Sequence, residues 1–138
     1  ALLNRFVDVQ GDGRIEVIPV DVNFGPYRGT GTIINVYDRM GSVDNTADDV
    51  LAESFRVVIF GDVNGDAIIR SVDSTIVDDE VYGFTSWSDE TIPDYCDYML
   101  FAADLDKNGI ISSNDAANIR CYVSGVVEID QVTGTIKR

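Results

Sequence analysis

The chain lacks histidine altogether and has few basic residues, and both shortages narrow its possible functions. Its 138 residues include 10 Lys and Arg against 24 Asp and Glu, for a formal net charge of −14. Without histidine, the commonest general base and the commonest zinc ligand are missing. No serine lies in a context typical of a nucleophile, so we expect a protein that is not an enzyme. The deficit of positive charge also disfavours nucleic acid, whose phosphates require a basic surface.

Long hydrophobic runs are also missing, and cysteine is scarce. No apolar stretch approaches the length that spans a bilayer, so we expect no membrane insertion. The two cysteines, Cys96 and Cys121, would allow one disulfide in an oxidising compartment. Both fall on predicted helical faces, where free cysteine is often simply buried. The sequence therefore leaves the pairing of these two cysteines open.

Acidic residues are concentrated in two segments that share one template, namely loop 1 (residues 62–73) and loop 2 (residues 104–115). Each places Asp or Asn at positions 1, 3, 5 and 12, a spacing that directs several oxygens at one hard cation, with the carbonyl of position 7 as a further ligand. Because the pattern is duplicated, it is more specific than one acidic cluster and predicts two Ca²⁺ ions. The predicted ligands are Asp62, Asn64, Asp66, Ile68 and Asp73 in loop 1, and Asp104, Asp106, Asn108, Ile110 and Asp115 in loop 2.

The two loops are not expected to bind calcium equally. Position 6 takes a positive φ, which suits Gly109 in loop 2, whereas Ala67 in loop 1 costs on the order of 1 kcal/mol. Position 9 is Ser112 in loop 2 but Arg70 in loop 1, and a guanidinium cannot coordinate a cation. We therefore predict that loop 1 is the weaker site, though still occupied at extracellular calcium levels.

The periodicity of apolar residues changes near Gly61. Before it, short alternating runs predict a small, mainly antiparallel β module over residues 1–60. After it, apolar residues at helical spacing predict three helices within residues 61–138, so the expected fold class is α+β with two domains. The expected strands include Arg14–Ile18, Thr32–Tyr37 and Ser54–Phe60. Two of the expected helices follow Asp73 and Asp115, and the third has Pro93 in its first turn.

Loop 1 follows a predicted strand, whereas a complete EF-hand needs a helix on both sides of its loop. From Gly61 to about Val127 the chain instead resembles the dockerin modules of bacterial cellulosome-type assemblies, three-helix modules with two F-hand-type calcium loops. The resemblance rests on the paired loops, on Asp at position 12, and on the helix that follows each loop. The stretch before Gly61 resembles the β-rich X module that precedes some dockerins.

The dockerin resemblance implies that the protein docks onto a cohesin module of a scaffold or cell-surface protein. It further implies a secreted, extracellular complex for polysaccharide degradation, and recognition residues at positions 10, 11, 17 and 18 of each repeat. Because the two sets differ in polarity and charge, we expect a single binding orientation. The sets are Ser71, Val72, Asp78 and Asp79 in the first repeat, and Ser113, Asn114, Arg120 and Cys121 in the second.

A second interpretation treats the two loops as purely structural. The chain would then be a calcium-stabilised spacer or a carbohydrate-binding module, whose β-rich first half presents Phe24, Tyr27 and Tyr37 to a sugar. These aromatics are few, and Tyr37 lies in an alternating strand that needs core residues. The docking interpretation is therefore preferred.

Overall fold

A computed structural model describes residues 13–20, 28–39, 47, 49–85 and 93–138, without the side chains of residues 93–96. Contacts within the chain divide it into two compact units. One comprises Ala1–Ile18 and Ile33–Arg56, and the other comprises Pro19–Thr32 and Val57–Arg138. This division differs from the boundary that the sequence suggested at residue 60. Within the described residues, none of the helices combines the length and the apolar character that a membrane crossing requires.

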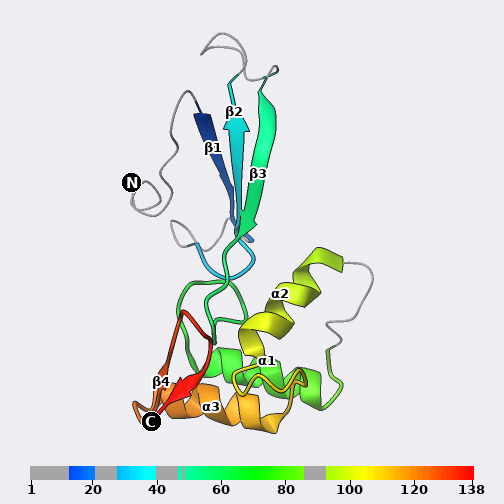
Figure 1. The fold of residues 1–138 in the computed structure, drawn as a ribbon. Coiled ribbons are helices and arrows are strands. Elements are labelled where there is room, and N and C mark those ends of the chain that lie inside the picture. Colours follow the sequence, from blue (N-terminus) through cyan, green and yellow to red (C-terminus); the bar gives the residue numbers. More distant parts are fainter. Residues whose placement is uncertain (1–12, 21–27, 40–46, 48, 86–92) are drawn as a thin grey trace. The chain divides into compact units, whose positions relative to one another are not determined.

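The first unit is built on a three-stranded antiparallel sheet, which agrees with the α+β class predicted from the sequence. Its strands are β1 (Gly13–Ile18), β2 (Ile33–Asp38) and β3 (Val50–Arg56), with β2 in the centre (Figure 1). In the register, Ile33 lies opposite Ile18 on one side and opposite Arg56 on the other. β-branched residues are frequent in β1 and β2, as expected for a pleated and partly buried surface.

The third strand lies earlier than predicted, at Val50–Arg56 instead of Ser54–Phe60. The apolar residues that follow it belong to the helical unit, where Phe60 is buried in the core. The backbone N–H and C=O of Ile59 both bond to the Thr30 hydroxyl rather than to a neighbouring strand. The sequence pattern showed an extended apolar run correctly, but it could not show which core that run would enter.

The described part of the second unit contains three helices of 11 residues each, in agreement with the sequence-based expectation. They are α1 (Ser71–Val81), α2 (Pro93–Ala103) and α3 (Ser113–Val123). In Figure 1, α1 and α3 run in opposite directions. The chain leaves these two helices at Gly83 and Gly125, whose φ angles of 77° and 73° fit the glycine that commonly ends a helix.

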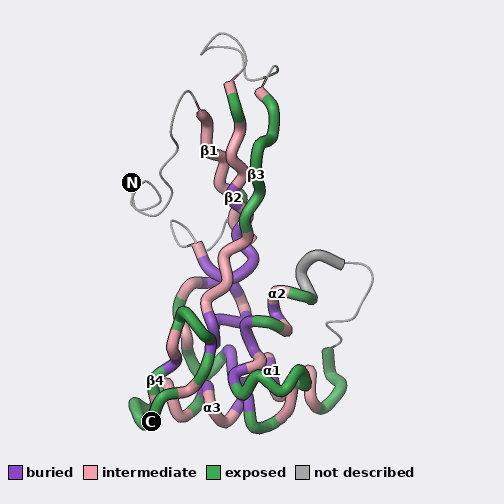
Figure 2. The backbone as a smooth tube through the Cα atoms, in the orientation of Figure 1, coloured by how far each residue is buried: buried purple, intermediate pink, exposed green. Residues whose placement is uncertain are grey.

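The core of the helical unit receives side chains from all three helices and from both loops. Figure 2 colours the buried positions along the backbone of this unit. Val77, Ala103, Leu105 and Ile119 are at most 1% exposed. The apolar faces predicted for the three helices are therefore largely confirmed. Val123, in the last turn of α3, is 46% exposed.

A small C-terminal hairpin completes the second unit, although no sequence pattern indicated it. Its strands are β4 (Glu128–Ile129) and β5 (Ile136–Lys137). Ile129 is buried in the core, and the side-chain amide of Gln131 makes two hydrogen bonds to the backbone of Phe60. The N–H of Phe60 donates over 2.8 Å and its carbonyl accepts over 2.9 Å. The hairpin is therefore fastened to the chain that enters loop 1.

Candidate functional site

The two loops fold alike, and their main hydrogen bonds recur with an offset of 42 residues. In each loop the carboxylate at position 1 accepts a hydrogen bond from the amide of position 6, and the carboxylate at position 12 accepts from the amides of positions 2 and 9. All six distances lie between 2.8 and 3.0 Å. The pairs are Asp62 with Ala67 and Asp73 with Val63 and Arg70 in loop 1, and Asp104 with Gly109 and Asp115 with Leu105 and Ser112 in loop 2.

The shorter turns inside the loops match as well. The amide of position 5 donates to the side chain at position 3, and the amide of position 7 donates to the side chain at position 5. These distances lie between 2.8 and 3.2 Å. The residues are Asn64, Asp66 and Ile68 in loop 1, and Asp106, Asn108 and Ile110 in loop 2. All ten residues predicted to bind calcium therefore occupy corresponding places in two matching loops.

Each position-12 carboxylate also caps the helix that follows its loop. Asp73 and Asp115 lie at the third positions of α1 and α3, where they accept the backbone N–H of Arg70 and Ser112. This arrangement is a capping box, in which a side chain satisfies an amide that the helix leaves unpaired. Both carboxylates are fully buried. The last three residues of each loop are also the first three of its helix, so loop and helix depend on each other.

Loop 2 gathers three carboxylates in a geometry that suits a cation. Asp104, Asp106 and Asp115 each place one oxygen within 4.8 Å of the others. Oδ1 of Asp104 is buried and has no hydrogen-bond partner among the described residues. A buried oxygen without a partner carries a free-energy cost, which a bound cation would remove. Because carboxylate, amide and carbonyl oxygens are the ligands that Ca²⁺ prefers, loop 2 fits calcium.

In loop 1, the carboxylates of Asp62 and Asp66 accept hydrogen bonds from other groups of the protein. Asp62 accepts hydrogen bonds from two amides within the loop and from the amide of Thr30, which lies 3.0 Å from Oδ2. Nη2 of Arg70 lies 3.1 Å from Oδ2 of Asp66. Burial raises the pKa of both Asp62 and Asp73 above its ordinary value, because desolvation opposes the negative charge. Loop 1, all of whose residues are described, shows no gathering of three carboxylates like that of loop 2.

Each loop contains two residues with positive φ, and only one of each pair is glycine. In loop 1 these are Gly65 (80°) and Ala67 (68°), and in loop 2 they are Lys107 (58°) and Gly109 (78°). The strain predicted at Ala67 is therefore present, but loop 2 carries similar strain at Lys107. Backbone strain does not make loop 1 the weaker site, and the expected difference between the loops rests on Arg70.

Lys107 also connects loop 2 to distant parts of the unit, and sequence reasoning missed this contact. Its Nζ lies 4.1 Å from the ring centroid of Phe60 and 5.1 Å from that of Phe101. Burial lowers the pKa of Lys107 below its ordinary value. Gly134 of the hairpin packs so closely that a Cβ there would lie 2.6 Å from both Nζ and the Phe60 ring. These residues are far apart in the sequence, so no local pattern marks them.

The predicted recognition residues lie on α1 and α3, and two of them bind each other. Oδ2 of Asp78 and Nη1 of Arg120 are 2.7 Å apart, which joins position 17 of one repeat to position 17 of the other. The first residues of both helices are exposed, whereas the residues at position 18 are half-buried, and Cys121 is a free thiol. The exposed residues are Ser71 and Val72 on α1, and Ser113 and Asn114 on α3; the half-buried residues are Asp79 and Cys121.

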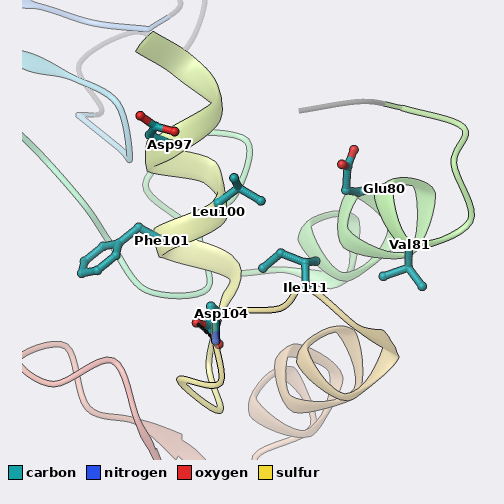
Figure 3. Close-up of a pocket in the computed structure, with 8 residues that line it drawn as sticks. Glu80, Val81, Asp97, Leu100, Phe101, Asp104 and Ile111 are labelled. Atoms are coloured by element: carbon teal, nitrogen blue, oxygen red, sulfur yellow. Dashed lines mark hydrogen bonds between the residues drawn. The ribbon is translucent and has the colours of Figure 1, made fainter. Parts of the chain in front are cut away.

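An open pocket of about 500 Å³ lies between α1, α2 and loop 2, beside the candidate metal site (Figure 3). Its lining combines apolar side chains with carboxylates. The sequence did not indicate it, because its residues come from three separate segments. They include Val81, Leu100 and Ile111 as apolar members, and Glu80, Asp97 and Asp104 as acidic members.

Two solved structures are similar to the chain over about half its length. One is a complex of the third cohesin of ScaC with the ScaB dockerin from Acetivibrio cellulolyticus, in which the dockerin carries an IN to SI mutation in its N-terminal helix. The matching chain of this complex is 34% identical to this chain. The match covers 56% of this chain and 97% of that chain, with a TM-score of 0.45. The other is the same complex with the mutation in the C-terminal helix, at 33% identity, 55% and 96% coverage and a TM-score of 0.44. No family model matches the chain, and no curated protein matches it.

Proposed function

We propose that the protein is a calcium-dependent docking module that binds a cohesin module within an extracellular complex. The observation that carries this proposal is the pair of matching loops, each of which leads directly into a helix with exposed first residues. The partner class comes from the resemblance of this duplicated motif to dockerins. In this proposal the loop carboxylates coordinate calcium, the bound calcium supports docking, and the chain is not a catalyst.

Calcium would link the loops to the docking helices. In loop 2, Asp104, Asp106, Asn108 and Asp115 would hold the ion together with the carbonyl of Ile110, and the corresponding residues of loop 1 would hold a second, weaker ion. A bound ion supplies the positive charge that offsets repulsion among the carboxylates. Because Asp115 also caps α3, the geometry of loop 2 and the start of the docking helix are fixed together.

The two helices offer a partner different chemistry at corresponding positions. Val72, at the start of α1, is 43% exposed and apolar, whereas its counterpart Asn114 on α3 is exposed and polar. Asp78 and Arg120 carry opposite charges and neutralise each other. A half-turn of the module would therefore present a different surface, and we propose that docking uses one orientation.

A sugar-binding role has less support among the described residues. The hydroxyl of Tyr37 donates to Oε2 of Glu16 over 3.0 Å, and the guanidinium of Arg14 lies 4.2 Å above the Tyr37 ring. Hydrogen bonds from Asn35 and Tyr37 lower the pKa of Glu16 below its ordinary value. One face of the Tyr37 ring is thus already covered, and Phe24 and Tyr27 lie outside the described residues.

Calcium removal tests the proposed function directly. In excess chelator, we expect binding to a cohesin panel to disappear and helical circular dichroism to fall, because the carboxylates of loop 2 then repel one another beside α3. Binding would be measured by surface plasmon resonance, and restored calcium should recover it.

A parallel pull-down against insoluble polysaccharides separates the docking role from the sugar-binding alternative. Retention on a polysaccharide without cohesin binding would favour the alternative. Undiminished cohesin affinity in chelator, with calcium confirmed absent, would contradict the calcium dependence.

A further inference from the structure

The two loops differ in what satisfies the carboxylate at position 1. In loop 1, Asp62 accepts three backbone amides, at 2.9 Å from Gly65, 3.0 Å from Ala67 and 3.0 Å from Thr30. In loop 2, Oδ2 of Asp104 accepts the amide of Gly109, while the buried Oδ1 has no partner among the described residues. The same position is therefore satisfied by the chain in loop 1 and left open in loop 2.

The loops also differ in the charge at position 9. Arg70 brings a guanidinium to 3.1 Å from Asp66, whose side chain is only 12% exposed. The counterpart of Arg70 in loop 2 is Ser112, whose neutral hydroxyl lies 3.2 Å from Oδ2 of Asp115. Loop 1 thus has a guanidinium bonded to one of its carboxylates, whereas the ammonium of Lys107 in loop 2 lies against the rings of Phe60 and Phe101.

Loop 1 is also held through hydrogen bonds and backbone packing by a segment outside its repeat, whereas the hairpin contacts loop 2 at the side chain of Lys107. The bracing segment, residues 28–32, lies against loop 1. Its Gly29 sits so close that a Cβ would be 2.2 Å from the carbonyl oxygen of Gly65. The Thr30 hydroxyl anchors the segment to both backbone groups of Ile59, at 3.0 and 3.1 Å. Residues 62–67 of loop 1 are buried or half-buried, whereas residues 106–110 of loop 2 are exposed.

We propose that Arg70 and the bracing segment hold loop 1 in its folded conformation without calcium, so that calcium controls the conformation of loop 2 alone. Any calcium that enters loop 1 must displace the guanidinium from Asp66 and therefore binds weakly there. Where the docking function proposed above holds, on which this consequence rests, the calcium dependence of docking resides in loop 2 and α3.

Amide hydrogen exchange in the calcium-free protein tests the conformational part of the proposal. The amides of Ala67 and Val63 should stay protected, while their counterparts Gly109 and Leu105 should exchange at least about tenfold faster. These four amides form the same hydrogen bonds in the two loops, so they are matched probes. Equal loss of protection in both loops, or global unfolding without calcium, would overturn the proposal.

Exchanging the position-9 residues tests the role of Arg70. By calorimetric calcium titration, Arg70→Ser should raise the affinity of loop 1 about tenfold or more and leave loop 2 unchanged. The reverse change, Ser112→Arg, should lower the affinity of loop 2 by a similar factor. An unchanged affinity of loop 1 in the Arg70→Ser variant would overturn the role assigned to Arg70.

Neither measurement involves a cohesin. A protein that fails to bind cohesins but shows the expected exchange pattern would contradict the docking function and leave the loop assignment standing. A protein that binds cohesins but loses amide protection equally in both loops would contradict only the proposed roles of Arg70 and the bracing segment.

Discussion

Gly29 is the point at which the bracing segment comes nearest to loop 1, and only a residue without a Cβ fits there. A Cβ would lie 2.2 Å from the carbonyl oxygen of Gly65 and 2.5 Å from the amide nitrogen of Ala67. The φ of Gly29 is not in the left-handed region, so the requirement is one of space. Gly83 is the converse case, since its φ is +77° and a Cβ there would meet nothing within 4 Å.

These two glycines provide a matched test of the packing of the bracing segment. We expect Gly29→Ala to lower the free energy of unfolding by about 3 kcal/mol, because the clash is with backbone that cannot move easily. Gly83→Ala should lower it by only about 1 kcal/mol, through backbone strain alone. Denaturant unfolding at a fixed saturating calcium concentration would measure both. Equal effects would show that the segment does not pack tightly on loop 1.

The individual loop residues show what a motif can and cannot reveal. The left-handed conformation of Ala67 was predictable, because the template assigns a positive φ to position 6. The same conformation at Lys107 was not, since the template says nothing about position 4. That Arg70 cannot coordinate calcium remains a prediction, and its ion pair with Asp66 depends on side-chain geometry that spacing does not define.

An ion pair joins the two arms of the C-terminal hairpin. Nζ of Lys137 lies 2.7 Å from Oδ2 of Asp130, and the amides of Val132 and Thr133 donate to the same side chain. These contacts, with the Lys137 hydrogen bond the largest, lower the pKa of Asp130 from 3.8 to about 2. A lowered folded-state pKa gives stability that is fully present above the unfolded value and lost as the pH falls through the folded value.

The ionised Asp130 should therefore still stabilise the hairpin at pH 3.8, and this stabilisation should be lost progressively as the pH falls towards 2. Lys137→Met should raise the pKa of Asp130 and move the loss to higher pH. An NMR titration of the Asp130 carboxyl would measure the change. Arg138→Met removes an equal charge one residue later and serves as the control. An unshifted Asp130 titration in Lys137→Met would contradict the ion pair.

Helices were easier to predict than strands in this chain. The three helices were expected because 11 residues give apolar side chains several turns in which to recur. α1 and α3 begin two residues earlier than expected, since Asp73 and Asp115 occupy the third helical position and not the first. The hairpin was missed because strands of two residues contain no period to detect.

The pairing of α1 with α3 determines how the whole module can present itself to a partner. Position 17 of each repeat lies at the contact between the antiparallel helices, where Asp78 binds Arg120. The two starting segments, Ser71–Val72 and Ser113–Asn114, are separate exposed regions of unlike polarity. A cohesin surface that suits one of them should not suit the other.

Single-orientation docking predicts unequal effects of mutating the two regions. Changing Ser71 and Val72 together, or Ser113 and Asn114 together, should abolish cohesin binding in one case and alter it less than about threefold in the other, because rim contacts contribute little. Binding would be measured at saturating calcium, with circular dichroism to confirm folding. Equal tolerance of either double change would indicate two orientations and contradict the prediction.

The division of the chain into units was only partly foreseeable. The change from strand-like to helical patterns near Gly61 lies between the three-stranded sheet and the three helices in the chain. The sequence could not assign residues 19–32 to the helical unit, because Thr30 and Gly29 contact loop 1 through backbone groups and close packing. Contacts of that kind leave no trace in hydrophobic periodicity.

The two hydrogen bonds between Gln131 and Phe60 bear on the rates of folding and unfolding. They join residues 71 apart in the sequence, whereas each loop closes within a dozen residues. Local contacts form first, because a contact between distant residues can form only after a long segment has closed, which costs more chain entropy. We therefore expect the Gln131 contact to form after the folding transition state. It would then lengthen the lifetime of the folded unit and leave the speed at which the unit folds almost unchanged.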